Sequence, residues 1–384
     1  SRGKTFSMGS WEGAVVEHGD EGGVRHRLVA WLADGKRVVV VSDAQGEEAI
    51  EVHHADASVA PDRLDGLDIG RAVALVPAPK GDLVAVANQR HELVLVDLAG
   101  RTARVLDRSR HERVLGLAWS PDARWLAYGL AVTRQTSIIR LCEVETGAVH
   151  DATRAVLHDA APAFDPEGKY LYFLSYREFN PVYDSLHFDL NFPRGSRPYL
   201  VTLQADTPSP FIPVPRAPGD KPKGDEEANG KDKPEDNPEG KANGGAAGDP
   251  APESETGDAD KAKGDEKKEE KPVRIDLEGI ADRVIAFPVP EGRYAQIRGI
   301  KGQALFTNAP VTSALGEAMP GVTTPPRAWL DGYRFDDQKL RTLVHEVTDF
   351  EVSKDAKTLV YRSGQRLRAI KAGETQLMIA GGVE

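Results

Sequence analysis

A strand–turn–strand pattern recurs along the chain, and its spacing constrains the fold more than any other feature of the sequence. Each copy joins two apolar runs through a short turn rich in Gly, Asp, Pro or Lys. In the first four copies the turn ends at Gly35, Gly81, Ala123 and Gly168, which are 46, 42 and 45 residues apart. Four-stranded propeller blades repeat every ~40–50 residues. The spacing therefore predicts an all-β propeller of four-stranded blades, whereas a solenoid of parallel strands has a shorter period.

Two more copies follow at residues 295–306 and 349–361, so six inner hairpins are expected in total. Each hairpin precedes strands with alternating polar residues, as is typical of the outer strands of a blade. Short apolar runs at 4–8 and 14–17 come before the first hairpin and resemble the outer half of a further repeat. We therefore expect a seven-bladed ring whose first blade is incomplete in this chain.

The composition changes abruptly inside the repeat array. Residues 216–272 consist mainly of Pro, Gly, Asn, Asp, Glu and Lys, with almost no aromatic or branched residues. Such a segment buries too little apolar area to offset ~1–2 kcal/mol of backbone entropy per ordered residue. We expect propeller blades at 1–215 and 273–384, with a disordered insertion at 216–272 inside one blade of a single propeller domain. A regulatory or partner-docking segment is the alternative interpretation of the insertion.

Charge and cysteine content exclude several classes of function. The net charge is −11 and the pI is about 5.5, so neither nucleic acid nor an anionic membrane is an expected partner. The single Cys142 cannot form an internal disulfide, and we interpret it as a small buried hydrophobic residue. No run of 18 apolar residues and no signal-peptide pattern is present, which favours a soluble protein. The chain begins at Ser1, so we interpret it as a piece of a longer protein.

No sequence motif for catalysis or metal binding is present. The Gly-x-Ser-x-Gly elbow of α/β hydrolases and the His-Glu-x-x-His motif of zinc hydrolases are both missing. His53 and His54 are adjacent, and adjacent strand residues point to opposite faces, so we interpret them, like His111, as surface histidines. Gly3-Lys4-Thr5 lacks the rest of a phosphate-binding loop. The sequence thus predicts no catalytic, cofactor-binding or metal-binding residue, although a dispersed Ser-His-Asp triad can be judged only from geometry.

The stretch from 160 to 203 departs from the ordinary repeat. After the hairpin around Gly168, residues 175–184 and 186–193 are too aromatic for a solvated loop and too irregular for a strand. This stretch resembles the second β-propeller of the tricorn protease family, the self-compartmentalising serine peptidases. The segments 276–280 and 283–294 are similar to the region after the insertion in those proteins, and 11–14 and 25–27 match more weakly. The resemblance spans almost the whole ordered chain.

The resemblance implies a non-catalytic propeller that gates or channels unfolded peptides toward an active site elsewhere. In this family the catalytic serine, its histidine and the oxyanion hole lie in mixed α/β domains after the second propeller, partly beyond a PDZ-like domain. This chain ends at Glu384, so none of those residues can be assigned here. The resemblance further implies that the parent protein is a cytoplasmic, homo-oligomeric serine peptidase without a cofactor. Its partners would be oligopeptides and its own C-terminal catalytic and PDZ-like domains.

The stretch between 177 and 194 is the strongest candidate for a specific role. Its aromatic residues suggest extensive burial, and Arg177, Asp184 and Arg194 are suited to pin it by charge-assisted hydrogen bonds. The favoured interpretation is a connection packed on its own propeller. Contact with a catalytic domain or neighbouring subunit, and direct contact with peptide, are the alternatives. The candidate interface or substrate-path residues are Arg177, Tyr183, Asp184, His187 and Arg194.

Two other assignments remain open at the level of sequence. The chain could be a TolB-like or WD40-like propeller that acts as a protein-interaction module without an attached enzyme. It could also be the cap propeller of a prolyl-oligopeptidase-like hydrolase. The motifs at 179–192 and 276–294 argue against both, because propellers in general share only the turn type seen at Ser120-Pro121-Asp122.

Overall fold

The computed structural model describes residues 3–9, 13–19, 22–178, 180–184, 189–191, 194–213, 272–310 and 328–375. These residues form β-strands and a single 3₁₀ turn. By its contacts the chain divides into two units, one of Ser1–Pro215 with Pro272–Glu384 and one of Arg216–Lys271. Apart from Pro272, the insertion expected at 216–272 lies outside the described residues. In the described ranges, no helix has the length and hydrophobicity needed to cross a membrane.

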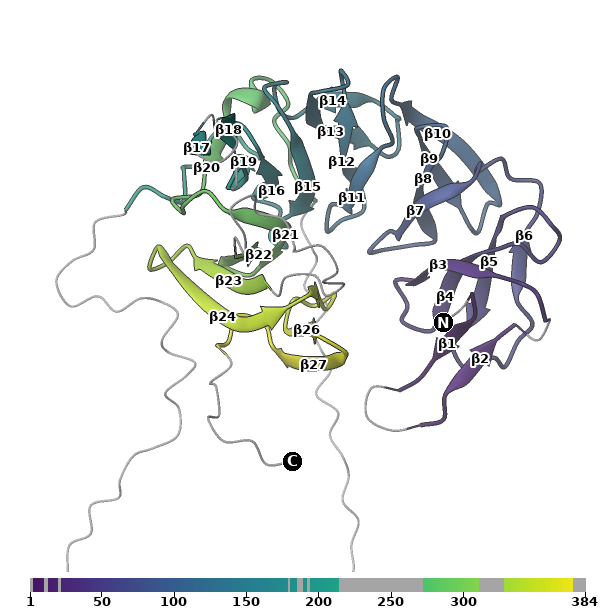
Figure 1. Cartoon of the computed structure of the whole chain (residues 1–384). Coiled ribbons are helices and arrows are strands. Elements are labelled where there is room, and N and C mark those ends of the chain that lie inside the picture. The colour runs from purple at the N-terminus through teal and green to yellow at the C-terminus, as the bar shows by residue number, and fades with distance from the viewer. Residues whose placement is uncertain are drawn as a thin grey trace, which may run out of the picture. The chain divides into compact units, whose positions relative to one another are not determined.

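The first three blades are four-stranded antiparallel sheets whose strand order follows the chain (Figure 1). Blade 1 contains β3 (His26–Trp31), β4 (Arg37–Ser42), β5 (Ala49–His54) and β6 (Asp62–Leu64). Blade 2 contains β7 (Ala72–Pro77), β8 (Leu83–Asn88), β9 (Glu92–Asp97) and β10 (Thr102–Arg108). Blade 3 contains β11 (Leu115–Trp119), β12 (Trp125–Ala131), β13 (Ser137–Glu143) and β14 (Val149–Asp151).

Blades 4 and 5 are also four-stranded, and blade 6 has three strands among the described residues. Blade 4 contains β15 (Asp159–Phe164), β16 (Tyr170–Ser175), β19 (Arg197–Thr202) and, after the turn η1 (Ile280–Asp282), β20 (Val284–Ala286). Blade 5 contains β21 (Arg293–Ile300), β22 (Gln303–Ala309), β23 (Ala328–Arg334) and β24 (Lys339–Val347). Blade 6 contains β25 (Asp349–Val352), β26 (Thr358–Ser363) and β27 (Arg366–Lys371). The sequence also predicts an outer strand of this blade at 376–380, and these residues lie outside the described residues.

In the described part of the chain, two small sheets are not hydrogen-bonded to any of the six blades through strand pairing. β1 (Thr5–Ser7) pairs with β2 (Val16–His18), and β17 (Val182–Asp184) pairs with β18 (Asp189–Asn191). The sequence predicted that β1 and β2 form the outer half of a seventh blade. Within the described residues, these two strands pair only with each other. The all-β propeller is thus confirmed with six blades, and no seventh blade is formed by the residues that the structure describes.

The hairpin turns explain the repeat seen in the sequence. The last turn residue of each inner hairpin has a positive φ, between 55° and 70°, at Gly35, Gly81, Ala123, Gly168, Gly302 and Ala356. Glycine adopts this left-handed conformation without steric cost, whereas alanine is strained there. The spacing of these turn residues therefore marks one structural position in every blade.

The hydrophobic cores lie between neighbouring blades. Each of five buried clusters combines apolar side chains from two consecutive blades, from blades 1 and 2 through blades 5 and 6. The second strand of a blade is the most buried, as β12 illustrates. Every residue of β12 is buried, because a neighbouring blade packs against each of its faces. Full burial of one large apolar side chain contributes ~1.5–3 kcal/mol to the stability of the fold. Because the inner strands are buried between two blades, their sequences are apolar on both faces.

Consecutive blades also meet through their first strands. Contacts join β3 to β7, β7 to β11, β11 to β15, β15 to β21 and β21 to β25. In five blades the pairing between the first and second strand is interrupted by a register shift near the start of the first strand. Gly116 lies at one of these shifts, with φ +64°, and a Cβ there would approach Pro162 Cδ to 2.9 Å. At Gly116 the first strands of blades 3 and 4 therefore approach each other closely.

Candidate functional site

Blade 4 carries a buried ion pair at the start of its first strand. The side chain of Asp159 is 1% exposed and accepts hydrogen bonds from Thr153 Oγ1 and Ser175 Oγ, each at 2.6 Å. The guanidinium of Arg177 binds both carboxylate oxygens of Asp159, through Nη2 at 2.6 Å and Nε at 3.1 Å. Such two-point pairing is stronger than a single neutral hydrogen bond and fixes the orientation of the arginine.

Arg177 is held further by aromatic side chains. Its guanidinium carbon lies 5.4 Å from the ring centre of Phe173 and 5.7 Å from that of Tyr199. A cation over an aromatic face is stabilised by the ring quadrupole. Arg177 therefore pins the beginning of residues 176–196, here called the blade-4 connection, which join β16 to β19. This is the pinning role that the sequence suggested for Arg177.

A second polar group anchors the blade-4 connection. Glu178 accepts hydrogen bonds from Arg197 Nη1 at 2.5 Å and Tyr199 Oη at 2.9 Å. Burial acts to raise the pKa of Glu178, but hydrogen bonds from Tyr199, Arg197 and Glu291 lower it overall. Burial and the contact with Glu178 raise the pKa of Glu291, which also accepts a bond from Asn180 Nδ2 at 3.2 Å. The two glutamates therefore share a hydrogen bond next to the connection.

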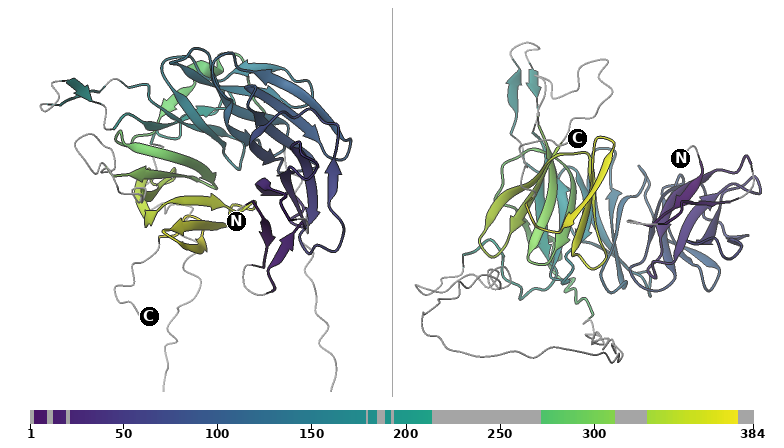
Figure 2. Two further views of the ribbon diagram at one scale, coloured as in Figure 1. Left: turned by 45° about the vertical axis from the view of Figure 1, so that its right-hand side comes forward. Right: turned by 90° about the horizontal axis from the view of Figure 1, so that it is seen from below.

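Beyond these anchors the blade-4 connection forms a projecting hairpin (Figure 2). The expectation that this stretch is too irregular for strands is wrong, because β17 and β18 pair over three residues each. The expectation of extensive aromatic burial is also wrong for the two described tyrosines outside the blades. Tyr183 is 61% exposed and Tyr176 is 44% exposed. The hairpin thus presents apolar surface rather than burying it on its own propeller.

Of the other candidate residues of this stretch, Arg194 can be compared with the anchor, whereas the side chains of Asp184 and His187 cannot. Arg194 is exposed, and no contact of its side chain with Asp159 or Glu178 is formed. Asp184 is placed by its backbone pairing with Asp189, while its side chain lies outside the described residues. His187 lies outside the described residues as well. Among the candidates whose side chains the structure describes, namely Arg177, Tyr183 and Arg194, Arg177 is the one that lies in a polar network.

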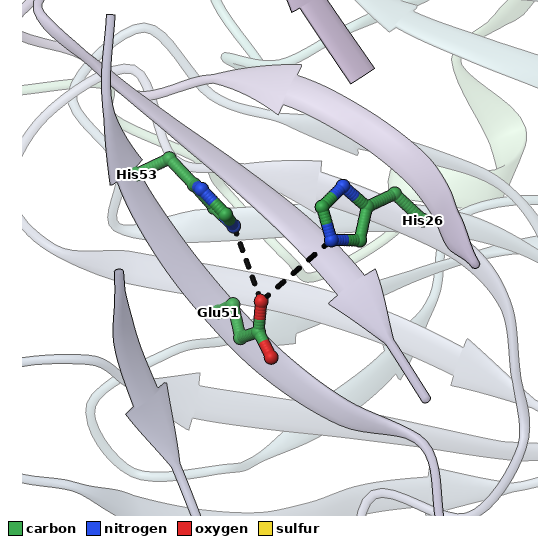
Figure 3. Close-up of side chains that lie close together, drawn as sticks. All are labelled: His26, Glu51 and His53. Carbon is green, nitrogen blue, oxygen red and sulfur yellow. Dashed lines mark hydrogen bonds and ion pairs between the residues drawn. The ribbon is translucent and has the colours of Figure 1, made fainter. Parts of the chain in front are cut away.

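A second cluster of polar side chains lies on blade 1 (Figure 3). Glu51 and His53 are two positions apart on β5, so their side chains point to the same face of the sheet. His26, at the start of β3, reaches the same carboxylate across the intervening strand β4. Glu51 Oε2 lies 3.2 Å from His53 Nε2 and 3.8 Å from His26 Nε2. We call His26, Glu51 and His53 the histidine cluster.

The histidine cluster is buried under the β1–β2 sheet. Its side chains are 4%, 8% and 3% exposed, in the order His26, Glu51 and His53. From β2, His18 packs its ring edge against His53, with 5.5 Å between ring centres. His18 Nδ1 and His26 Nδ1 are buried and make no hydrogen bond within the described residues.

Electrostatics favour the neutral forms of His18 and His26 and the charged form of Glu51. Burial lowers the pKa of His18 and of His26, and in each case proximity to His53 lowers it further. Burial acts to raise the pKa of Glu51, but hydrogen bonds from His53, Ser42 and Arg63 bring it to about 2. Arg63 Nη1 donates to Glu51 Oε1 at 2.9 Å, which leaves Oε2 to face the two imidazoles.

The sequence interpretation missed this cluster. His53 was expected on the surface and is buried, whereas His54 is half-buried and His111 is exposed. The available signal was Glu51-Val52-His53, because alternate strand residues share a face. His26 could not be added from sequence, since its approach to β5 depends on the pairing of both strands with β4.

Geometry also decides the question of a dispersed serine triad. His18 Nε2 lies 2.8 Å from Ser7 Oγ, but His18 Nδ1 has no hydrogen-bond partner in the described parts of the chain. His158 Nδ1 lies 3.5 Å from Ser137 Oγ, whose hydroxyl also donates to the backbone oxygen of Asp159 at 2.9 Å. Neither described Ser–His pair has a carboxylate that orients its imidazole, so neither forms a Ser-His-Asp arrangement.

Comparisons with known proteins bear on the whole chain. A family model described as "Tricorn protease second beta propeller domain" matches residues 1–373. Tricorn protease homolog 1 of Streptomyces coelicolor is 34% identical over 355 residues, which cover 91% of this chain and 30% of that protein. A tricorn protease homolog of Saccharolobus solfataricus is 31% identical over 306 residues, which cover 80% of this chain and 23% of that protein.

A solved structure supports the same fold. The crystal structure of the tricorn protease is similar with a TM-score of 0.72 and 22% sequence identity, over 97% of this chain and 31% of that chain. This chain thus spans less than a third of the length of these three proteins. Because the family model covers nearly all of the sequence, the chain belongs to the family of tricorn protease second β-propeller domains.

Proposed function

We propose that this chain is the non-catalytic propeller of a longer tricorn-like serine protease, in which it gates or channels unfolded peptides toward an active site in other domains. The observation that carries this proposal is the match of the family model to residues 1–373. A cytoplasmic, homo-oligomeric parent without a cofactor belongs to the same proposal.

The first strands of the blades supply a surface that suits an unfolded chain. Each first strand is an edge of its sheet, so one side of its backbone is free of partners within that sheet. Extended peptides bind such edges through main-chain hydrogen bonds, which are independent of peptide sequence. Small or apolar side chains are exposed on these strands, at Val29, Leu115, Ala160 and Ala295. A surface of this kind favours extended peptides of varied sequence.

The blade-4 connection is our proposed docking element for the catalytic or PDZ-like domains, or for a neighbouring subunit. Arg177 and Glu178 hold its beginning in buried or partly buried polar networks. Its hairpin then exposes Val182 and Tyr183, and a large exposed aromatic side chain is a typical anchor of a protein interface. A firmly held base with an apolar tip is the arrangement that docking requires.

The seven-bladed ring remains part of this proposal. The β1–β2 sheet lies against blade 1, where Gly3 O accepts a hydrogen bond from His26 N at 2.6 Å. A two-stranded sheet in this place is suited to be the outer half of a further blade. An electron-microscopy map of the full-length protein will show seven blades if the proposal is right, and a ring of six would contradict it.

Peptide hydrolysis by the full-length protein tests the proposed function. We expect the full-length protein, but not residues 1–384 alone, to cleave fluorogenic peptides and to lose activity with a serine-directed inhibitor. Leu115→Arg places a charge on an exposed first-strand position and should lower kcat/KM by about tenfold, or ~1.4 kcal/mol. Leu367→Arg on the exposed face of β27 is the matched control and should leave kcat/KM unchanged.

The outcomes separate the proposal from its alternative. Hydrolysis by residues 1–384 alone would show that this chain is catalytic and overturn the proposal. Equal kcat/KM values for the Leu115→Arg and Leu367→Arg variants would contradict the proposed channelling role. If the full-length protein is also inactive, the interaction-module function is favoured, for which the exposed hairpin is the supporting observation.

A further inference from the structure

We propose that the histidine cluster of His26, Glu51 and His53 is a zinc site in blade 1. This inference does not depend on the proposed function, because zinc binding by buried side chains of blade 1 requires neither peptide channelling nor docking by the blade-4 connection. Each of the three residues offers one ligand atom, and the three atoms lie within 4.8 Å of one another. Two imidazoles and one carboxylate are the protein ligands of many three-ligand zinc sites.

The separations between ligand atoms fit a small tetrahedral ion. With zinc–ligand bonds of ~2.0–2.1 Å, two ligands of a tetrahedral site lie ~3.3 Å apart. The distances from Glu51 Oε2 to the nitrogens of His53 and His26, 3.2 and 3.8 Å, bracket this value. The two carboxylate–nitrogen distances therefore need to change by only a few tenths of an ångström for zinc to bind, and the two imidazole nitrogens already lie within 4.8 Å of one another.

His26 supplies a second, independent observation. Its Nδ1 is buried without a hydrogen bond in the described structure, and its Nε2 lies 3.8 Å from Glu51 Oε2, which is beyond hydrogen-bond distance. A buried polar group without a partner is costly, and in native proteins it commonly indicates an unseen water or ion. Coordination through Nε2 would give this imidazole a strong polar contact on the side that faces Glu51, while Nδ1 would still lack a partner among the described residues.

The surroundings of Glu51 are those of an oriented metal ligand. Arg63 binds Oε1 at 2.9 Å and fixes the carboxylate so that Oε2 faces both histidines. Metal-binding carboxylates are typically held by such outer contacts. Coordination by His53 Nε2 requires the tautomer that carries its proton on Nδ1, and zinc then takes the place of the hydrogen bond between His53 and Glu51.

The nature and number of ligands favour zinc over harder cations. Magnesium and calcium prefer sites built from oxygen ligands, whereas imidazole suits zinc and its first-row neighbours. Three protein ligands leave the fourth tetrahedral position for water. Burial beneath β1–β2 would make this a site that stabilises the packing of the N-terminal strands on blade 1.

Zinc binding to residues 1–384, prepared without a polyhistidine tag, tests the inference. Calorimetric titration with zinc sulfate should give one ion per chain and raise the melting temperature by several degrees. His26→Gln and His53→Gln should each weaken binding by ~100-fold or more. His111→Gln removes an exposed histidine and should leave zinc affinity and the zinc-dependent rise in melting temperature unchanged.

Each outcome decides the matter. Failure of the wild-type chain to bind zinc, or equal affinity of the His53→Gln and His111→Gln variants, would overturn the site. If a cluster variant does not fold, the wild-type chain is titrated with cobalt instead. The intense visible bands of four-coordinate cobalt support the proposal, and a spectrum of six-coordinate hydrated cobalt refutes it.

Discussion

At the scale of single residues, two aspartates of blade 4 have opposite surroundings. Asp159 is buried but is paired with Arg177. Asp165, in the turn between β15 and β16, is buried without a cation on its carboxylate and accepts bonds only from Lys169 N and Tyr172 Oη in the described structure. Burial raises the pKa of Asp165 to about 6. Neutral hydrogen bonds satisfy this carboxyl group but do not compensate its charge.

Asp165 should make the stability of the protein fall with rising pH between about 4 and 6. In this window the folded state holds a proton that the unfolded state has lost, so the free energy of unfolding decreases as pH increases. A shift of about two pKa units corresponds to ~3 kcal/mol. We expect urea denaturation to show that the free energy of unfolding of Asp165→Asn, relative to that of the wild type, increases by up to this amount between pH 4 and pH 7. A constant difference between the two proteins would show that the pKa of Asp165 is not raised.

Single-residue environments were the part least accessible from sequence. Arg177 could be singled out because a charged residue stood in an aromatic stretch, but its partner Asp159 lies 18 positions earlier in the chain. His26 and Glu51 are 25 positions apart and meet only after three strands have paired. Such contacts depend on register and packing, which local patterns do not specify.

At the scale of elements, turn chemistry made the inner hairpins predictable. All six lie where glycine or alanine occupies the left-handed turn position between two apolar runs. The β17–β18 hairpin lacked this signal, since the residues between its strands include neither glycine nor proline. Its strands are short, and its aromatic residues suggested burial rather than exposure. Local turn signals therefore predicted the blades and missed the element that projects from them.

The exposed hairpin should contribute little to the stability of the propeller. Tyr183→Ala removes an exposed side chain, so the free energy of unfolding of residues 1–384 should change by less than ~0.5 kcal/mol. In the full-length protein the same change should weaken oligomer assembly, as measured by sedimentation velocity. Leu367→Ala, at another exposed apolar position, is the control. A destabilisation of 1–384 by more than ~1 kcal/mol would show that Tyr183 packs on its own blades.

At the scale of the whole molecule, the propeller is interrupted within blade 4. Residues 214–271 fall between the paired strands β19 and β20. The flanking segments are joined directly, because Asp276 N donates to Leu203 O and Ala205 N donates to Asp276 Oδ2, each at 2.9 Å. The composition of the insertion located it in the sequence, whereas the hydrogen bonds that close blade 4 around it appear only in the structure.

Deletion of residues 221–271 should leave the melting temperature of the propeller nearly unchanged. The segment has few residues able to join a core, and the deletion keeps the contacts at Leu203 and Asp276. Differential scanning calorimetry of the wild-type and shortened chains measures the effect. A longer deletion, 221–276, removes the buried Val273 and the Asp276 contacts and should lower the melting temperature clearly. A drop of several degrees with the shorter deletion would show that residues 221–271 pack on the blades.

The closed junction at Leu203 and Asp276 has a practical consequence. Since the hydrogen bonds that join β19 to β20 do not require the residues between them, a fluorescent protein could replace part of 221–271 without breaking a sheet. Such an internal label would leave both chain ends free. The full-length protein could then be followed in living cells by light microscopy.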